Sequence, residues 1–299
     1  MSVGALGNVH AGYRGIARFS TVTEDVRFAD ANITARQEIN APDLIMGDWD
    51  HDAYVFGKIE VGGSISGPVT ETFADAAGGL FPWAVKRNGN CGTLDPADLE
   101  LWYYCGTGTN YRSFTGLFCN SIQFSCAAGD VAQFSIDVVG TSATALTNST
   151  APQRTTAEKL VTWDKVGVTI TAGDIVIPVT GRYSNFDFTI ANNVETVYGL
   201  GQTDLFPFDI VPGLRTITGS LSVYNTPNFP GANDYEAYCA DQPATISFSI
   251  GGSTACGSTS LDIDMKVRFH RIEPTSAVGP IVSTVAFTGV THQTGSPWE

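Results

Sequence analysis

Polar and apolar residues alternate along several stretches of the chain. From Leu261 to His270, five apolar side chains alternate with five charged or titratable ones. The same period of two appears in 245–250, in 185–190 and in 132–138. Successive side chains of a β-strand point to opposite faces of a sheet, so this pattern predicts strands with one buried face.

Helical spacing is scarce. One candidate lies between Thr72 and Lys86, but Gly78, Gly79 and Pro82 interrupt it, so we expect a short helix there. A second is expected to begin near Pro96, where Asp95 could cap the first turn and Asp98 and Glu100 would suit it. The predicted fold class is mainly β.

Two segments of the chain echo each other. Residues 57–66 and 213–222 both read G-x5-G-S-[IL]-S, with a shared glycine in mid-strand. Each is followed by a strand that begins and ends with glycine, 129–140 and 279–289. Either the chain holds two related halves, or the echo is a coincidence in a glycine-rich sequence.

The echo predicts a division of the chain. We expect an N-terminal arm over 1–35, a first half over 36–140, a linker or arm over 141–160 and a second half over 161–299. Residues 141–159 are rich in Thr, Ser, Ala and Asn and have no apolar period, which favours a linker.

Composition adds limits on the function. The 299 residues are 43% hydrophobic and 15% charged, which is typical of a globular protein, and length alone allows one large unit or two domains. The net charge of −14 disfavours binding to phosphate backbones, because that requires clustered Lys and Arg. No apolar run reaches the roughly 18 residues of a membrane span, and the start lacks a signal peptide, so we expect synthesis in the cytoplasm.

The sequence offers no convincing catalytic or metal site. Residues 48–52 (DWDHD) resemble the start of a calcium loop, but Ala53 and Ile59 stand where the loop needs Gly and Glu. The four histidines lack metal-binding spacing, and Asp262 and Asp264, two apart on one strand, are more typical of an interface or solvent-facing pair. We therefore expect no cofactor, no metal and no enzymatic activity.

The six cysteines include no C-x-x-C pair, so neither a zinc ribbon nor a thioredoxin-type site is indicated. Buried free thiols are the expected state. Oxidation of one pair after exposure outside the cell stays open.

A family resemblance rests on three segments. Residues 114–124 and 129–140 follow the pattern G-x3-N-S-[IL]-x-[FL], a glycine turn and an alternating strand. The pattern residues are Gly116, Asn120, Ile122 and Phe124. Residues 186–195, with Asn193, run on to Gly219 and Ser220, and an earlier segment runs from Arg36 to Gly63 and Ser64. In order and spacing these segments resemble the tail tube proteins of long-tailed bacteriophages.

The resemblance implies a tail-tube β-sandwich or barrel, a place in the virion tail and self-assembly into stacked rings through which DNA passes. Two halves per chain would make a ring of three chains pseudo-hexameric, and a true hexamer is the alternative. Tail terminator, tape measure and baseplate proteins are the other implied partners, with no membrane and no specific DNA binding.

DNA must slide through such a tube without sticking, so acids on the non-core faces of strands are expected to line the lumen. The candidates are Glu60, Asp137, Asp187, Asp262 and Asp264.

Two other functional classes compete with this interpretation. One is a β-sandwich adhesin or carbohydrate-binding module, in which residues 101–104 with Tyr235 and Tyr238 form a platform for sugars. The other is a glycosidase or protease on a β scaffold, although no acid/base or nucleophile set supports it. Four tryptophans could anchor either the core or an interface, namely Trp49, Trp83, Trp102 and Trp163.

Overall fold

The structure is a computed structural model of the whole chain. It describes residues 15–22, 26, 28–40, 55–70, 73, 79–88, 92–105, 108–145, 147–148, 160–172, 175–178, 183–201, 204–224, 244–250, 261–270 and 282–290. These residues form a mainly β fold with almost no helix, as the alternating pattern predicted.

The strands in chain order are β1 (Gly15–Phe19), β2 (Asp30–Ala31), β3 (Thr34–Asn40), β4 (Val55–Pro68), β5 (Arg87–Asn88), β6 (Thr93–Leu94), β7 (Ala97–Cys105), β8 (Gly108–Ala127), β9 (Gln133–Gly140), β10 (Ser142–Ala143), β11 (Thr147–Asn148), β12 (Val166–Ala172), β13 (Ile175–Pro178), β14 (Tyr183–Ala191), β15 (Val194–Val197), β16 (Asp209–Pro212), β17 (Thr216–Tyr224), β18 (Ala244–Ile250), β19 (Leu261–Phe269) and β20 (Val282–Gly289). The helices are α1 (Leu80–Val85) and the short 3-10 helix η2 (Trp163–Lys165).

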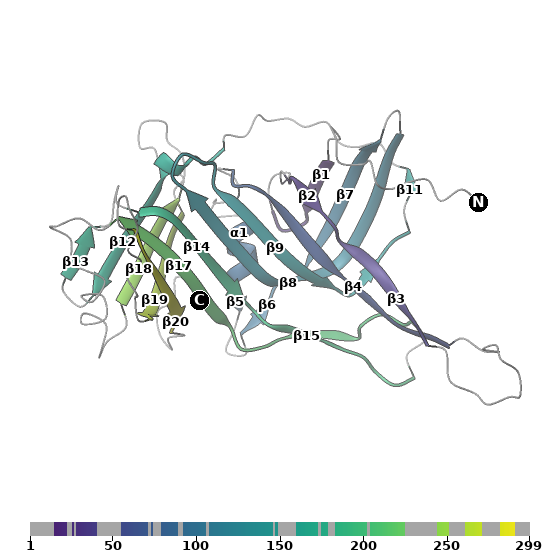
Figure 1. Cartoon of the computed structure of the whole chain (residues 1–299). Coiled ribbons are helices and arrows are strands. Elements are labelled where there is room, and N and C mark those ends of the chain that lie inside the picture. The colour runs from purple at the N-terminus through teal and green to yellow at the C-terminus, as the bar shows by residue number, and fades with distance from the viewer. Residues whose placement is uncertain are drawn as a thin grey trace, which may run out of the picture.

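One antiparallel sheet runs through the molecule. Its main path is β13-β12-β18-β19-β20-β17-β14-β8-β9-β4-β2, and β7 and β1 continue from β8 (Figure 1). The long strand β8 makes this continuity possible, because its first part pairs with β7 and its last part with both β9 and β14. The pairing of β8 with β14 joins the earlier strands to the later ones.

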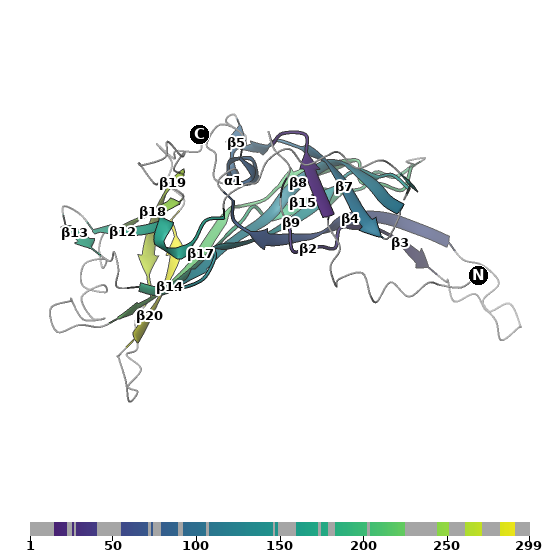
Figure 2. The ribbon, with the colours of Figure 1, turned by 90° about the horizontal axis from the view of Figure 1, so that it is seen from above.

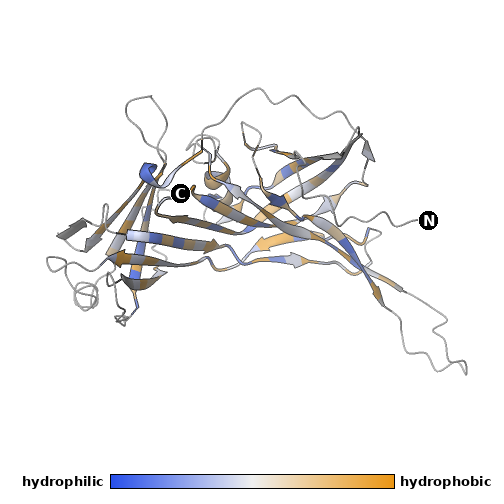
Figure 3. Cartoon of the chain, turned by 45° about the horizontal axis from the view of Figure 1, so that its top comes forward, coloured by the Kyte–Doolittle hydropathy of each residue, from blue (hydrophilic) through white to orange (hydrophobic). Residues whose placement is uncertain are grey.

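The core lies on one side of this sheet. α1 lies on that side, and both ends of the sheet bend toward it (Figure 2). Phe81 of α1 packs edge-on against Phe188, and Phe124 of β8 stacks near Phe188 and Phe186. Apolar and polar residues alternate along the strands, as the bands of colour in Figure 3 show. Burial of these rings together with the aliphatic side chains of the core drives the folding of the sheet.

Strand order repeats on the two sides of the β8–β14 pairing. The first strand set is β3-β4-β9-β8-β7-β1, and each neighbouring pair is antiparallel. The second strand set is β14-β17-β20-β19-β18-β12, again with every pair antiparallel. When the strands of each set are numbered along the chain, strands with the same number therefore take the same position in both sets.

The register of the two sets also agrees. Gly63 lies opposite Val138 in the first set, and Gly219 lies opposite Phe287 in the second. The residue after each glycine makes the same bond: Ser64 Oγ donates to Asn32 Oδ1, and Ser220 Oγ donates to Asp187 Oδ1.

These two glycines leave no room for a side chain. A Cβ on Gly219 would lie 2.5 Å from the Asp187 carbonyl oxygen and 2.4 Å from the Phe287 ring, and one on Gly63 would lie 2.7 Å from the Asn32 carbonyl oxygen. Gly63 also has a φ of +149°, which L residues rarely adopt. The shared glycine of the echo is thus required by the close approach of a neighbouring backbone.

Several sequence-based expectations can be judged on the fold. The short helix within 72–86 is confirmed as α1, with Lys86 as its C-cap residue. The helix expected near Pro96 is wrong, because residues 97–105 form β7, where Leu99 and Leu101 point into the core. Pairing with β8 and burial of alternate side chains outweigh the capping signal of Asp95 in this segment.

Parts of the segments expected to be arms belong to the sheet. Within residues 1–35, β1 pairs with β7 and β2 pairs with β4, and Ala17 and Phe19 are buried. Within 141–160, β10 and β11 pair with β8. Sheet pairing therefore holds these parts of both segments.

Two cysteines are described as free and buried, Cys119 and Cys126. Burial raises the pKa of the Cys126 thiol to about 11 and that of Cys119 further. Both therefore match the expectation of buried free thiols. The structure does not describe the burial or disulfide state of the other four cysteines.

Replacing either tightly packed glycine should destabilise the protein. We expect Gly63→Ala and Gly219→Ala each to lower the free energy of unfolding by about 1–3 kcal/mol, because the new methyl group overlaps backbone atoms. Gly167→Ala in β12 is the matched control, since its Cβ would meet Ser249 Cβ at an ordinary 3.6 Å. Chemical denaturation of the three variants measures this, and equal stabilities would contradict the packing argument.

Candidate functional site

The side of the sheet opposite α1 is polar and rich in small hydroxyl residues. Ser and Thr recur at the outward positions of β4, β9, β8, β14, β17, β20 and β18, for example at Ser64, Ser135, Ser125, Thr189, Ser220, Thr284 and Ser247. These positions are neighbours across the strands, as in Ser66 with Ser135 and Thr169 with Ser247. We call this surface the polar face.

Four of the five candidate lumen acids lie on the polar face. Glu60, Asp137 and Asp264 are exposed and Asp187 is half-buried. Asp262 lies in β19 opposite Ser249, and its side chain is outside what the structure describes. The structure thus places these acids over strands from both sets.

Neighbouring hydroxyl groups hold two of these acids in place. Ser121 Oγ donates to Asp137 Oδ2 at 2.8 Å, and Ser220 donates to Asp187. Basic residues also lie on this face: Lys58 Nζ is 2.6 Å from Glu60 Oε1, and Lys266 and Arg268 follow Asp264 on β19. The polar face is therefore a hydroxyl surface with scattered charges of both signs.

The residues of the family-like pattern have structural roles along β8. Ile122 and Phe124 are buried in the core. Gly116 has a φ of +60°, and a Cβ there would lie 2.4 Å from Thr141 Oγ1. Asn120 sits at an irregularity in the β8–β9 pairing, and its side chain Oδ1 accepts a bond from Val194 N at 3.1 Å. Asn120 therefore ties the first strand set to the segment that follows β14.

A buried asparagine links the two strand sets. The Asn192 side chain is fully buried and donates from Nδ2 to the carbonyl oxygens of Ala84 in α1 (2.9 Å) and Cys119 in β8 (3.0 Å). Its Oδ1 accepts a bond from Arg215 Nε at 3.1 Å. The adjacent Asn193 has a φ of +51° and donates to the Leu214 carbonyl oxygen. The chain turns sharply here as it leaves β14.

Two arginines complete this junction. Arg87 donates to the Gly213 carbonyl oxygen at 2.9 Å, and Arg215 donates to the Val85 carbonyl oxygen. Burial, and then the nearby Arg87, lower the pKa of Arg215 to about 10, while Cys119 opposes this shift. Arginine stays protonated at neutral pH, so both guanidinium groups remain charged, and their bonds to backbone and amide oxygens bridge the sets.

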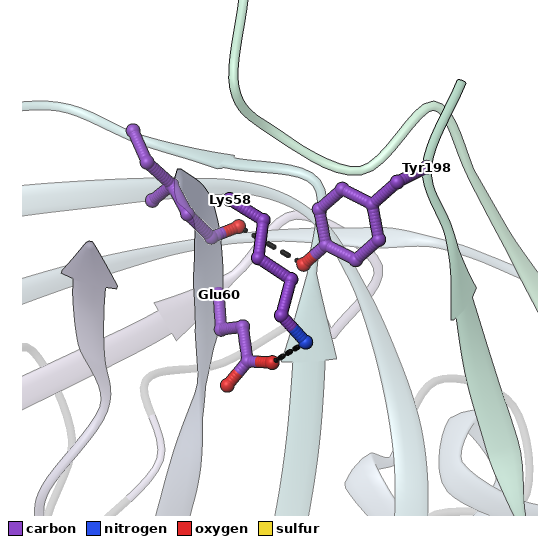
Figure 4. A network of polar contacts seen from close by, with 4 residues as sticks. Lys58, Glu60 and Tyr198 are labelled. Atoms are coloured by element: carbon purple, nitrogen blue, oxygen red, sulfur yellow. Dashed lines mark hydrogen bonds and ion pairs between the residues drawn. The ribbon is translucent and has the colours of Figure 1, made fainter. Parts of the chain in front are cut away.

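A long arm leaves this junction and crosses to the first strand set. It contains β15, β16 and the connecting residues, and it lies along the lower side of the molecule in Figure 1. Ile59 N donates to the Leu205 carbonyl oxygen at 2.7 Å, and Tyr198 Oη donates to the Ile59 carbonyl oxygen at 3.1 Å. In Figure 4 the Lys58 side chain lies beside the Tyr198 ring and reaches Glu60, and Lys58 Nζ is 5.5 Å from the ring centroid. The pKa of Lys58 is raised, chiefly by its hydrogen bond to Glu60.

Exposed large apolar side chains gather on this arm and near it. The arm region carries Val197, Leu200, Leu205, Phe208, Val211 and Leu214, and Ile39 and Phe56 lie at the outer end of the β3–β4 pairing. A concentration of exposed apolar groups in one part of a protein marks a surface that another molecule covers.

Other candidate features of the sequence do not form a site in the described residues. No group of three or more His, Cys, Asp or Glu there could hold a metal ion, and no helix among them is long and apolar enough to span a membrane. Residues 48–52 and Trp49, together with Tyr235 and Tyr238, lie outside the described residues.

The tryptophans divide between core and surface. Trp83 and Trp102 are buried, and Trp163 is exposed. The burial of Trp102 against Tyr111 counts against its use in a sugar platform.

Sequence reasoning missed the junction formed by Arg87, Asn192 and Arg215. Asn192 lies in the family-like segment 186–195, and Arg215 lies in the echo segment 213–222, but neither pattern includes these residues. Arg87 follows α1 with no local pattern around it. Only the fold brings these residues together. Arg87 and Asn192, for example, are bonded although more than 100 residues separate them in the chain. Two consecutive asparagines at the end of an alternating strand were the one available signal.

Comparison with known proteins now adds to this geometry. No curated protein matches the chain. A family model described as phage tail tube protein matches residues 10–289, which include both strand sets, the junction and the arm. This family consists of structural proteins, and nothing observed favours an adhesin. Because the match covers nearly the whole chain, the protein belongs to the phage tail tube family and is a structural subunit of the tail tube in the virion.

Proposed function

We propose that each chain contributes two related halves to a ring of three chains, so that the ring is pseudo-hexameric. One observation carries this proposal: the first and second strand sets have the same strand order and the same register at Gly63 and Gly219. We propose residues 36–140 and 161–299 as these halves, with 1–35 and 141–160 as an arm and a linker that also contribute short strands to the sheet. A hexamer of whole chains is the alternative.

Ring formation follows from the way the halves already meet within a chain. The β8–β14 pairing extends one sheet from one half to the next by backbone hydrogen bonds. Head-to-tail contacts of this kind close into a ring when each step turns by the same angle. Rings of this kind would stack into the tube.

We propose that the polar face lines the lumen. Its small hydroxyl residues form a wetted surface, and its acids, including Glu60, Asp137, Asp187, Asp262 and Asp264, repel DNA phosphates at contact. The repulsion is short-ranged, since screening at physiological salt acts over about 8 Å. The core side, which carries α1, would then face outward.

The remaining parts of the proposal concern partners and origin. The tube would contact tail terminator, tape measure and baseplate proteins at its ends and in its bore, and DNA would pass without specific binding. The chain would be synthesised in the cytoplasm of the host cell and have no membrane partner.

The number of chains per ring tests the two-half proposal. We expect native mass spectrometry of disassembled tubes, or an averaged cross-section of intact ones, to give three chains per ring. Six chains per ring would overturn the pseudo-hexameric trimer and leave the tube function intact.

Charge reversal tests the lumen assignment. We expect phage carrying Glu60→Lys, Asp137→Lys, Asp187→Lys and Asp264→Lys together to assemble tails but to eject DNA at least about tenfold more slowly, because lysines bind phosphates. The matched control reverses four exposed acids that lie outside the strands of the polar face, Asp130, Asp164, Asp204 and Asp209. Equal ejection rates for the two quadruple variants would refute the lumen assignment.

A further inference from the structure

The outer end of the β3–β4 pairing carries two exposed apolar side chains that face each other across the strands. Ile39 lies opposite Phe56 in the register, and each side chain is 60% exposed. We call these paired residues the tip. Two large apolar side chains side by side in water are unfavourable unless another surface covers them.

The arm contains the counterpart of the tip. Val194 lies opposite Pro212 in β15–β16, and the next pair is Glu195 with Val211. These pairs continue the β14–β17 segment in the same way that Ile39–Phe56 and Asn40–Val55 continue β3–β4. The counterpart of the tip in the second strand set is therefore the Val194–Pro212 pair at the base of the arm.

Within one chain, that base is covered by the first strand set. Val194 N donates to Asn120 of β8, and β15 and β16 pack on β8 and β6. The arm further on is bonded to Ile59 of β4. The tip has no equivalent cover among the described residues, where β3 pairs only with β4.

We propose that the tip docks on the second strand set of a second copy of the chain, as the arm docks on the first strand set within one chain. This inference rests on the self-assembly proposed above and names the surfaces that meet. Each copy then gives its tip to one neighbour and receives the tip of another, which is a head-to-tail contact.

The receiving surface follows from the correspondence of the two sets. Phe118 pairs with Val139 in the first set, and the corresponding pair in the second set is Arg268 with Thr288. His270, two residues after Arg268, therefore corresponds to Asn120, which is two residues after Phe118. The tip corresponds to the base of the arm, and that base is bonded to Asn120, whereas Ile59 is bonded to residues further along the arm. The tip should therefore lie beside His270, which is exposed.

The chemistry of the two surfaces suits this contact. The second copy would cover Ile39 and Phe56 beside its His270, which removes their apolar surface from water. Among the described residues, the edge of β3 beside the tip pairs with no strand, and the counterpart β14 uses that edge to pair with β8 from Asn185 to Ala191. Apolar contact and strand pairing would thus act together at one interface.

A pair of opposite charges tests this contact directly. We expect Ile39→Lys alone and His270→Glu alone to raise the protein concentration needed for tube assembly at least about tenfold, because each buries an unpaired charge. The double variant should recover most of the loss, since the two new charges meet at the interface. Trp163→Ser is the control for removing an exposed apolar side chain elsewhere, as Trp163 is 51% exposed beside β12.

Sedimentation and negative-stain imaging of the four variants measure assembly, and thermal melting of the unassembled chains shows that each is folded. If Ile39→Lys assembles as the unmodified chain does, the docking inference is wrong and the tube function stands. If the folded single variants fail to assemble and the double variant does not recover, the contact of Ile39 with His270 is wrong. If the unmodified chain never assembles, the proposed function itself fails.

Discussion

Backbone hydrogen bonding between β8 and β14 is the interaction on which the rest of the structure depends. A strand edge exposes a row of N–H and C=O groups that must be satisfied by another strand or by water. In this chain the edge of β14 is satisfied by the last part of β8, over seven consecutive residue pairs from Asn185 to Ala191. The same pairing joins the two strand sets, supports the polar face across both and places the arm against β4.

Close packing then fixes how the strands of each set lie. Gly63 and Gly219 admit no side chain, so a neighbouring backbone can approach each strand at the same place in both sets. The serine that follows each glycine bonds to a neighbouring polar side chain, Asn32 just before β3 in the first set and Asp187 of β14 in the second. In each set the glycine and the serine after it thus determine the register of the sheet. The register in turn determines which residues lie on the polar face.

The sequence predicted local structure well because strand alternation is a local signal. The alternating stretches at 132–138, 185–190, 245–250 and 261–270 fall on β9, β14, β18 and β19, except for the end residues Ala132 and His270, and each has buried apolar residues. The helix predicted to begin near Pro96 was wrong, because Asp95 and Asp98 are typical of a helix start but the segment pairs with β8 as a strand. The placement of Glu60, Asp137, Asp187 and Asp264 on one face required the order of strands, which no local pattern gives. Likewise, Arg87 and Asn192 meet only through the fold.

The junction around Asn192 has a consequence for the conditions that the particle can withstand. Its bonds join amide, guanidinium and backbone groups, and the pKa of Arg215, although lowered, is still about 10. None of these groups gains or loses a proton in mildly acidic or mildly alkaline water. A carboxylate at the same place would be neutralised in acid and would release its partner. Mild changes of acidity would therefore leave this internal connection of the tail tube subunit unchanged in charge.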